Sequence, residues 1–336
     1  MPMIDSKPFA AWWRRGSPKK RVGRLLLWLA VAWSAGAVLA GTAARDALHV
    51  GFSSTMFTEI NENDARAVVK GWCQTIAKQR SIDMDPDSKI LKDAPALLAA
   101  FQANLVDAAG MTALEFHELQ RHAGLAHIFV CYTAGRNVEQ YVLLVRQDSK
   151  INCLTELRGR GLITRLNARC CLAQSWLDIL LAQNGLKLSG DFFGKINQNT
   201  RLSKVVLPVF FRQADACLVN LSGFETMKEL NPQIGRELKV LASSPQVVPV
   251  VFVFRASYAP AFMDQLLTSL NELHQSPAGQ QVLAIFQSER IEERPAEFLA
   301  GTMELIETHE RILAGKDALA SGLQSPPVAG ARKANE

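Results

Sequence analysis

Hydroxyl side chains follow the first strand-like segment of the sequence. Residues 48–52 form a short apolar run of strand length, and Ser53, Ser54 and Thr55 come directly after it. In α/β proteins, small ligands bind beyond the carboxyl ends of strands, where such hydroxyls can contact them. The same residue types also cap helices, and one side chain can do both. We therefore interpret these three residues as ligand contacts, helix caps or both.

A second candidate site lies at Asn167, just before a predicted long helix over residues 168–183. Asn167 stands at the N-cap position of that helix. The free N–H groups of Arg169 and Cys170 and the helix dipole would then attract an anion. Arg165 or Arg169 could add a charge-assisted hydrogen bond, although either could equally be a solvated surface arginine. An ordinary α/β turn without a ligand explains the same pattern.

Apolar periodicity predicts alternating strands and helices, which places the chain in the α/β class. The predicted strands are 48–52, 82–91, a segment ending at 112, 127–132, 141–146, 161–164 and 247–255, and the predicted helices are 65–79, 94–103, 168–183, 261–274, 278–286 and 297–313. Two apolar runs, 141–146 and 247–255, are suited to crossing between lobes. This divides the chain into lobe 1 (48–139 plus 256–315) and lobe 2 (140–255), with hinges near 139–141 and 255–256.

A short pattern occurs twice, about a hundred residues apart. The sequence NLVDAA around Asp107 corresponds to RQADAC around Asp215, and a polar residue stands five positions beyond each aspartate: Thr112 in one case and Asn220 in the other. Each lobe would thus present a polar group from the end of an equivalent strand. The two aspartates begin those strands, so we interpret them as structural rather than as ligand contacts.

The N-terminus has the pattern of an export signal. Six Lys and Arg residues between positions 14 and 24 precede an uncharged stretch at 25–44 that ends in small residues. This pattern is typical of a secretory signal, here cleaved after Ala44, and the stretch is also long enough to be an uncleaved membrane anchor. Both interpretations place the remaining chain outside the cytoplasm. At the other end, the Pro- and Gly-interrupted residues 316–336 are predicted to be disordered.

Composition and cysteine spacing argue against nucleic-acid and metal binding. The formal charge of +5 is concentrated in the N-terminal basic segment, so the remainder is near neutral and no nucleic-acid partner is indicated. The six cysteines form no CxxC pair and have no histidine pair nearby, so we expect no metal and no organic cofactor. One disulfide in lobe 2 stays open as an alternative, with buried free thiols as the preferred interpretation.

The motifs and their order resemble those of a known family. YVLLVRQDSKI at 141–151, followed by LTELRGRG at 154–161, resembles the start of the second lobe in type II periplasmic solute-binding proteins. Further pieces agree in order with the phosphate/phosphite/phosphonate ABC-transporter (PhnD-like) branch, and these are HVGF, NLVDAAGMT, GDFF, QADACLV, SSP and SPAGQQVL, within residues 48–313. The resemblance implies an α/β, two-lobed periplasmic-binding-protein-like (type II) fold with two crossover strands and a central cleft.

The resemblance also implies a function. Such proteins capture a small solute, here a phosphate- or phosphonate-like anion, by hinge closure and deliver it to an inner-membrane permease of an ABC transporter. This chain would be a monomeric periplasmic binding protein without catalytic residues, either free or tethered to the inner membrane by residues 25–44. The implied cleft residues, with the hydroxyl run included, are Ser53, Ser54, Thr55, Thr112, Tyr141, Asn167, Ala168, Arg169, Cys170 and Asn220.

The predicted ligand clamp departs from the family pattern. Where the family has a Ser/Thr-rich turn, this chain has NARCC from Asn167 to Cys171. A histidine before the QADAC strand and an acidic residue near Asn220 are also missing, so a phosphonate ligand does not follow from the scaffold. Two other functions fit the fold: a sensing module for a partner kinase or cyclase, and an enzyme of the pyrimidine- or thiamine-processing type. The enzyme would need a nucleophile, for which Cys170 or Cys171 is the candidate.

Overall fold

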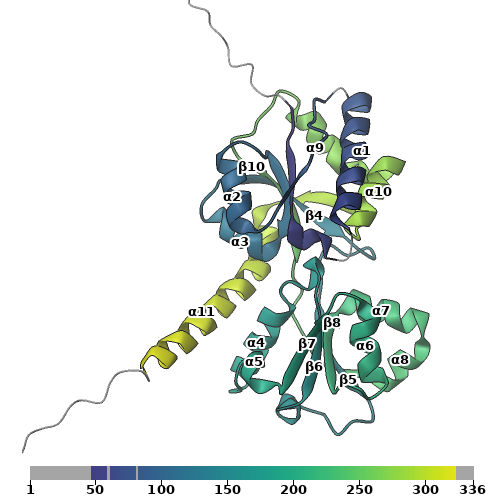
Figure 1. Ribbon diagram of the computed structural model, residues 1–336, viewed down its shortest axis with the longest axis vertical. Coiled ribbons are helices and arrows are strands. Elements are labelled where there is room, and N and C mark those ends of the chain that lie inside the picture. The colour runs from purple at the N-terminus through teal and green to yellow at the C-terminus, as the bar shows by residue number, and fades with distance from the viewer. Residues whose placement is uncertain (1–46, 59–60, 81, 323–336) are drawn as a thin grey trace, which may run out of the picture. The chain divides into compact units, whose positions relative to one another are not determined.

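The computed structural model describes residues 47–58, 61–80 and 82–322. Their strands form two separate sheets (Figure 1), one in the order β11-β4-β10-β3-β1-β2 and one in the order β7-β6-β8-β5-β9. We call the six-stranded sheet with its helices lobe 1 and the five-stranded sheet with its helices lobe 2. Because two sheets are present rather than one continuous sheet, the predicted two-lobed α/β fold is confirmed.

Lobe 1 combines the first part of the described chain with the part that follows β9. Its strands are β1 (Val50–Ser53), β2 (Lys89–Leu91), β3 (Ala108–Thr112), β4 (Leu125–Tyr132), β10 (Val250–Arg255) and β11 (Arg290–Arg294). Its helices are α1 (Glu62–Arg80), α2 (Ala94–Gln102), α3 (Ala113–Gln120), α9 (Met263–Asn271) and α10 (Pro277–Ile285), with short 3-10 helices η1 (Ser54–Phe57), η4 (Leu273–Gln275) and η5 (Ala296–Leu299).

Helices cover both faces of the lobe 1 sheet because successive strand residues point to opposite sides. In β3, Ala108 packs in a cluster with residues of α1, α9 and α10, whereas Met111 packs with α2 and α3. In β4, Phe129 belongs to the first cluster and Val130 to the second. Figure 1 shows the two groups of helices on either side of the sheet.

Lobe 2 follows the same plan. Its strands are β5 (Tyr141–Arg146), β6 (Gly161–Arg165), β7 (Lys195–Asn199), β8 (Ala216–Asn220) and β9 (Leu238–Ser243). Its helices are α4 (Ala173–Gln183), α5 (Ser189–Phe192), α6 (Leu202–Phe210), α7 (Leu221–Leu230) and α8 (Pro232–Glu237), with the short 3-10 helices η2 (Leu154–Leu157) and η3 (Ala168–Cys170). In β5, Tyr141 and Leu143 pack against α4, and Val142 and Leu144 pack against α6 and α7. The strands predicted at 141–146 and 161–164 are therefore confirmed.

The repeated sequence pattern has the same structural role in both lobes. Asn104 and Arg212, at matching positions, both have a left-handed backbone, with φ of 54° and 61°. The Asp107 carboxylate accepts the N–H of His49 (2.8 Å), just before β1, and the Asp215 carboxylate accepts the N–H of Gly161 (2.9 Å), where β6 begins. Each aspartate thus ties the start of its own strand to the parallel neighbour, and the prediction that both are structural is confirmed.

The chain crosses between the lobes twice, and the two crossing segments are hydrogen-bonded to each other. The first runs from β4 to β5 and the second from β9 to β10. The N–H of Glu139 donates to the carbonyl of Val247 (2.7 Å), and the N–H of Val247 donates to the carbonyl of Glu139 (2.9 Å). The hinge predicted near 139–141 agrees with the first crossing.

The second predicted hinge, at 255–256, is wrong. β10 pairs with β3 and β4 in the lobe 1 sheet, so the chain has already left lobe 2 by Val250. Arg255 lies at the far end of β10 and pairs with Asp107 inside lobe 1. The lobe 2 boundary predicted at 255 moves to the β9–β10 connection for the same reason. An apolar, β-branched run fits a central strand as well as a crossing strand, and the sequence pattern does not separate the two.

The C-terminal helix α11 (Ala300–Gly322) contacts both lobes and the second crossing. The Thr302 hydroxyl accepts the N–H of Val248 in the crossing (2.8 Å). His309 Nε2 lies 3.2 Å from an Asp178 carboxylate oxygen on α4, and Glu310 pairs with Arg121 at the C-cap of α3 (2.6 Å). The helix continues past residue 316, where disorder was predicted, and residues 323–336 lie outside the described residues.

The contact between α11 and α4 predicts a defined acid sensitivity. Burial works to raise the pKa of Asp178, but hydrogen bonds from His309 and Ser189 together hold this pKa below its usual value. A carboxyl with a lowered folded-state pKa stabilises the protein above its unfolded pKa and loses that contribution as pH falls through the folded value. We expect the unfolding free energies of wild type and Asp178→Asn, measured with urea, to converge as the pH falls below about 4. A difference that stays constant from neutral to acid pH would contradict this.

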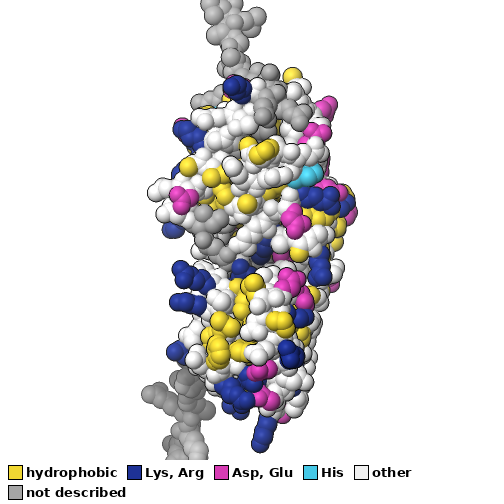
Figure 2. All heavy atoms as spheres, turned by 90° about the vertical axis from the view of Figure 1, so that its right-hand side faces the viewer, with side chains coloured by type: hydrophobic (Ala, Val, Ile, Leu, Met, Phe, Trp, Pro, Cys, Tyr) yellow, Lys and Arg dark blue, Asp and Glu magenta, His cyan; other side chains and the backbone are white. Residues whose placement is uncertain are grey.

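Charges of both signs are interspersed over the face that Figure 2 shows, where Lys and Arg (dark blue) lie near Asp and Glu (magenta). This agrees with a near-neutral chain beyond the N-terminal basic segment. The predicted signal or anchor at 1–44 lies outside the described residues. None of the helices in the described part of the chain is long and apolar enough to cross a membrane.

Candidate functional site

The predicted hydroxyls of lobe 1 do converge, but they converge on a carboxylate of the protein itself. Glu115 in α3 is buried, and its carboxylate accepts hydrogen bonds from the hydroxyls of Ser53, Thr55 (3.1 Å) and Thr112 (2.8 Å). It also accepts the N–H of Thr112 (2.9 Å). Ser54 is separate from this group and donates to the carbonyl of Lys92 (3.0 Å). A solute anion would therefore meet hydroxyls that already donate to a negative charge.

Glu115 is not among the predicted site residues, although the sequence carries a signal for it. Thr112 and Glu115 form a capping box at the start of α3, in which each side chain bonds the other residue's backbone N–H. The spacing T-x-x-E directly after a buried strand predicts this motif. The further bonds from Ser53 and Thr55 arise because β1 and β3 are adjacent and end at the same edge of the sheet.

The long helix on which the predicted anion site of lobe 2 was based is not a single helix. The helix expected over 168–183 is two elements, because η3 ends at Cys170 and α4 begins only at Ala173. Asn167 does act as a cap, but its side-chain oxygen accepts the N–H of Cys170 (2.9 Å). The Cys170 N–H was predicted to point into the cleft, but it already donates to Asn167 in the same turn.

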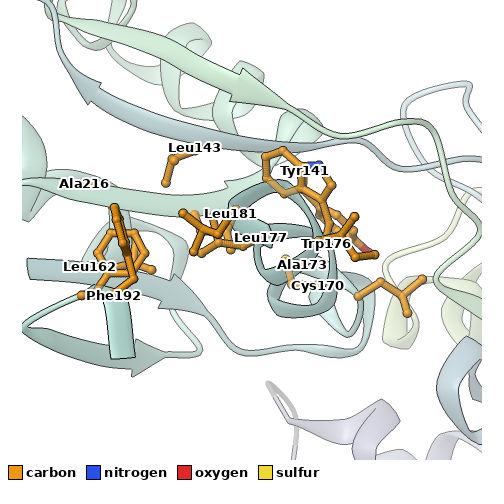
Figure 3. Close-up of a cluster of buried hydrophobic side chains, with 14 of the residues drawn as sticks. Tyr141, Leu143, Leu162, Cys170, Ala173, Trp176, Leu177, Leu181, Phe192 and Ala216 are labelled. Atoms are coloured by element: carbon orange, nitrogen blue, oxygen red, sulfur yellow. The ribbon is translucent and has the colours of Figure 1, made fainter. Parts of the chain in front are cut away.

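Tyr141 is a core residue rather than an exposed cleft residue. Its side chain is fully buried (0% exposed) and lies among the α4 side chains in Figure 3, near Trp176 and Ala173. Its hydroxyl donates to the carbonyl of Arg169 (3.0 Å), which holds the η3 turn in place. Burial raises the pKa of Tyr141 well above its usual value, so the phenol stays a neutral donor.

Asn220 stands at the end of β8, as the repeat predicted, and it connects the η3 turn to the first crossing. Its amide nitrogen donates to the Glu139 carboxylate (3.2 Å) and to the Ser222 hydroxyl (2.6 Å). Its amide oxygen accepts hydrogen bonds from Arg165 (3.1 Å) and from the Cys170 thiol (3.8 Å). Asn220, Ser222 and Arg169 all contact the carboxylate of Glu139. Glu139 was predicted only as part of a hinge, without a chemical role.

Arg169 is a charged residue of lobe 2 that contacts both the first crossing and lobe 1. From lobe 2 it pairs with Glu139 in the first crossing (3.1 Å), and both side chains are more than nine-tenths buried. Its Nη2 donates to the carbonyl of Gln287 (2.9 Å) and the hydroxyl of Ser288 (3.1 Å), both in the lobe 1 connection from α10 to β11. Its Nε is buried and has no hydrogen-bond partner among the described residues.

A small cavity lies at this junction. Its volume is about 30 Å³, enough for two or three waters. Lobe 2 contributes Asn167, Ala168 and Arg169, and lobe 1 contributes Met56, Thr58, Val250, Ile285, Phe286 and Gln287. Three of the predicted site residues therefore line a cavity between the lobes. The lining does not include the other seven, which are Ser53, Ser54, Thr55, Thr112, Tyr141, Cys170 and Asn220.

The six cysteines are free thiols, but only three of them are buried as the preferred interpretation predicted: Cys73, Cys170 and Cys217. Burial raises the pKa of Cys171, and its thiol donates to the carbonyl of Pro249 (3.3 Å). A raised pKa is the opposite of what a nucleophile needs, so Cys171 does not fit the enzyme hypothesis. Among the described residues, no group of three or more His, Cys, Asp or Glu side chains is arranged to hold a metal ion.

Sequence comparison identifies the family. The model of the periplasmic substrate-binding proteins of phosphonate ABC transporters matches residues 57–297, which is more than half of the chain. The chain belongs to this family. It is a periplasmic solute-binding component of an ABC transporter, which takes up a small solute for a membrane permease, and it is not an enzyme. No curated protein matches the sequence.

Solved structures agree with this family's fold. The XAC2383 protein of Xanthomonas citri, solved with chloride, has a TM-score of 0.59 at 17% identity, over 80% of this chain and 99% of that one. A phosphonate-transporter binding protein of Pseudomonas aeruginosa has a TM-score of 0.55 at 17% identity, over 79% and 87%. PhnD1 of Prochlorococcus marinus, solved with methylphosphonate, has a TM-score of 0.54 at 15% identity, over 80% and 98%. At these identities the likeness concerns the fold alone.

Proposed function

We propose that this binding protein captures a small oxyanion of the phosphonate class in the cavity between its lobes, with Arg169 as the charged contact. The observation that carries the proposal is the Arg169 Nε. It is a buried donor on a cationic side chain, it belongs to a residue that lines the cavity, and it has no partner among the described residues. Buried donors rarely go unpaired, and an oxyanion is the acceptor that pairs best with a guanidinium.

The junction geometry supports capture by hinge closure. Arg169 belongs to lobe 2, but its Nη2 donates to the Gln287 carbonyl in lobe 1. Its Nη1 pairs with Glu139 in the first crossing. An anion bound at Nε would add a further contact to a residue that already spans the junction. Ligand binding would therefore stabilise the arrangement in which the lobes meet.

Three finer points belong to the same proposal. The solute is delivered to an inner-membrane permease, with a sensor kinase or cyclase as the alternative partner, and the protein acts as a monomer. Residues 25–44 either direct export and are removed or hold the protein at the inner membrane. Purification from the periplasmic and the membrane fractions, followed by N-terminal sequencing and mass measurement in solution, establishes whether residues 25–44 are removed and whether the protein is a monomer.

The first test is a thermal-shift screen of phosphate, phosphite, methylphosphonate, sulfate, small carboxylates and a neutral sugar. We expect oxyanions to raise the melting temperature once they exceed their dissociation constants, because they bind only the folded protein. Arg169→Lys should weaken the best hit by about 10- to 100-fold in titration calorimetry, because lysine keeps the charge but lacks the Nε donor.

Arg165→Lys is the matched control. It makes the same chemical change four residues earlier, at the end of β6, but Arg165 bonds Asn220 and does not belong to the cavity lining. Oxyanion affinity should stay within about twofold of wild type in this variant. A screen in which only neutral solutes shift the transition, or an equal loss in both variants, would contradict the proposal.

A further inference from the structure

A second cavity lies inside lobe 1, next to the first. It occupies about 50 Å³ between the sheet and helices α9 and α10. Its wall includes Phe52 and Phe252 from the sheet, Leu270 from α9, and Val282 and Leu283 from α10. No charged side chain belongs to the lining, in which Ser288 and Cys131 are the only residues with polar side-chain atoms.

The two cavities share part of their walls. Met56 and Phe286 line both of them. The carbonyl of Phe286 lies 3.5 Å from Arg169 Nη2 on the polar side, and the ring of Phe286 stacks on Phe52 (centroids 4.9 Å apart) on the apolar side. Methionine is flexible, so the Met56 side chain can open a passage at small cost. The polar and apolar spaces therefore form two ends of one potential site.

The apolar space suits alkyl groups better than water. A water needs about 10–15 Å³ of such space and two to four polar partners, so about 50 Å³ holds three to five water-sized groups. The lining offers too few polar atoms to hold that many waters. A chain of about three or four methylene groups would fill the same space and gain the benefit of leaving water.

We infer that the solute is an alkyl oxyanion, with its charged head at Arg169 and a short unbranched alkyl chain in the apolar cavity of lobe 1. This inference rests on the proposed function and specifies its substrate class. A bare phosphate or a methylphosphonate would use only the polar end. Arg169 selects an anionic head group, and the apolar cavity of lobe 1 limits the length of the solute's alkyl chain.

Titration calorimetry with methyl-, ethyl-, propyl-, butyl- and octylphosphonate tests the inference. We expect affinity to rise about fourfold per added carbon, as burial of one methylene predicts, and then to stop rising or fall by the octyl compound because the space is full. Propanesulfonate in parallel separates the contribution of the alkyl chain from that of the phosphonate head. A gain that continues to octyl would mean that the chain lies on an open surface, and it would overturn the inference.

Val282→Phe is the variant that fills the cavity. It should abolish the gain with chain length while methylphosphonate affinity stays within about twofold of wild type. Val240→Phe makes the same chemical change on the half-exposed β9 of lobe 2, outside both linings, and should keep the gain. If Val282→Phe does not fold, the wild-type series decides alone. A flat series with methylphosphonate still bound overturns this inference and leaves the proposed function intact, whereas no binding of any oxyanion overturns the proposed function itself.

Discussion

Replacing Glu139 by alanine is expected to lower the free energy of unfolding by about 3–5 kcal/mol. The Glu139 carboxylate is 4% exposed and pairs with an Arg169 side chain that is 7% exposed. Removing one partner leaves the guanidinium buried without its counter-charge, and this desolvation cost exceeds the net value of the pair. The loss also removes the acceptor of the Asn220 amide and the Ser222 hydroxyl.

Urea unfolding of four variants (Glu139→Ala, Glu237→Ala, Arg169→Met and the double variant Glu139→Ala with Arg169→Met) checks this expectation. Glu237→Ala is the control, since Glu237 also pairs with an arginine, Arg146, but is 40% exposed, and exposed pairs contribute about 0–1 kcal/mol. The double variant with Arg169→Met should be less destabilised than the two single losses summed, because neither charge is then left alone. Equal decreases in the free energy of unfolding for Glu139→Ala and Glu237→Ala would contradict the expectation that breaking the buried pair costs more than breaking the exposed one.

Asp107→Ala is expected to destabilise the protein by about 3–5 kcal/mol, and Asp215→Ala by only about 1 kcal/mol. The two residues hold the same place in the repeated pattern. Asp107 is 3% exposed and receives two hydrogen bonds from Arg255, at 2.6 and 3.0 Å, beside the backbone N–H of His49. Asp215 is 34% exposed, and Arg160 approaches it only to 3.4 Å.

The paired measurement separates the ionic contribution from the backbone contribution. Each aspartate accepts one N–H at the start of a strand, so that part of the loss is common to both variants. The excess for Asp107→Ala then measures the buried pair with Arg255 together with the contact to the His49 ring (2.9 Å). Asn variants, which keep one acceptor oxygen, should recover more stability at position 215 than at 107. Equal destabilisation by the two alanine variants would contradict this account.

The parts of the fold that sequence predicted well are those determined by local pattern. The run Tyr141–Arg146 is apolar and β-branched, and it forms β5 with the predicted bounds. The Asn167 cap was also correct as a local contact. The second crossing was placed wrongly at Arg255 because an apolar run does not specify which sheet its strand joins.

The site was predicted less well because its contacts join distant parts of the chain. Arg169 meets Glu139, thirty residues away, and Gln287, more than a hundred residues away. No spacing rule relates such positions, so a single arginine looks the same in sequence whether it is buried or solvated. Of the predicted hydroxyls of lobe 1, Ser53, Thr55 and Thr112 converge and Ser54 does not, and the carboxylate at their centre comes from the neighbouring helix.

The hydrogen-bonded pair of crossing segments limits how the two lobes can move. Glu139 and Val247 bond each other in both directions, so the two connections cannot slide past one another without breaking both bonds. Pro245 and Pro249 fix two φ angles in the returning connection. Few soft torsions remain in the two connections. We therefore expect opening to follow a single rotational axis, so that the rate of solute release depends on the torsional stiffness of these few residues.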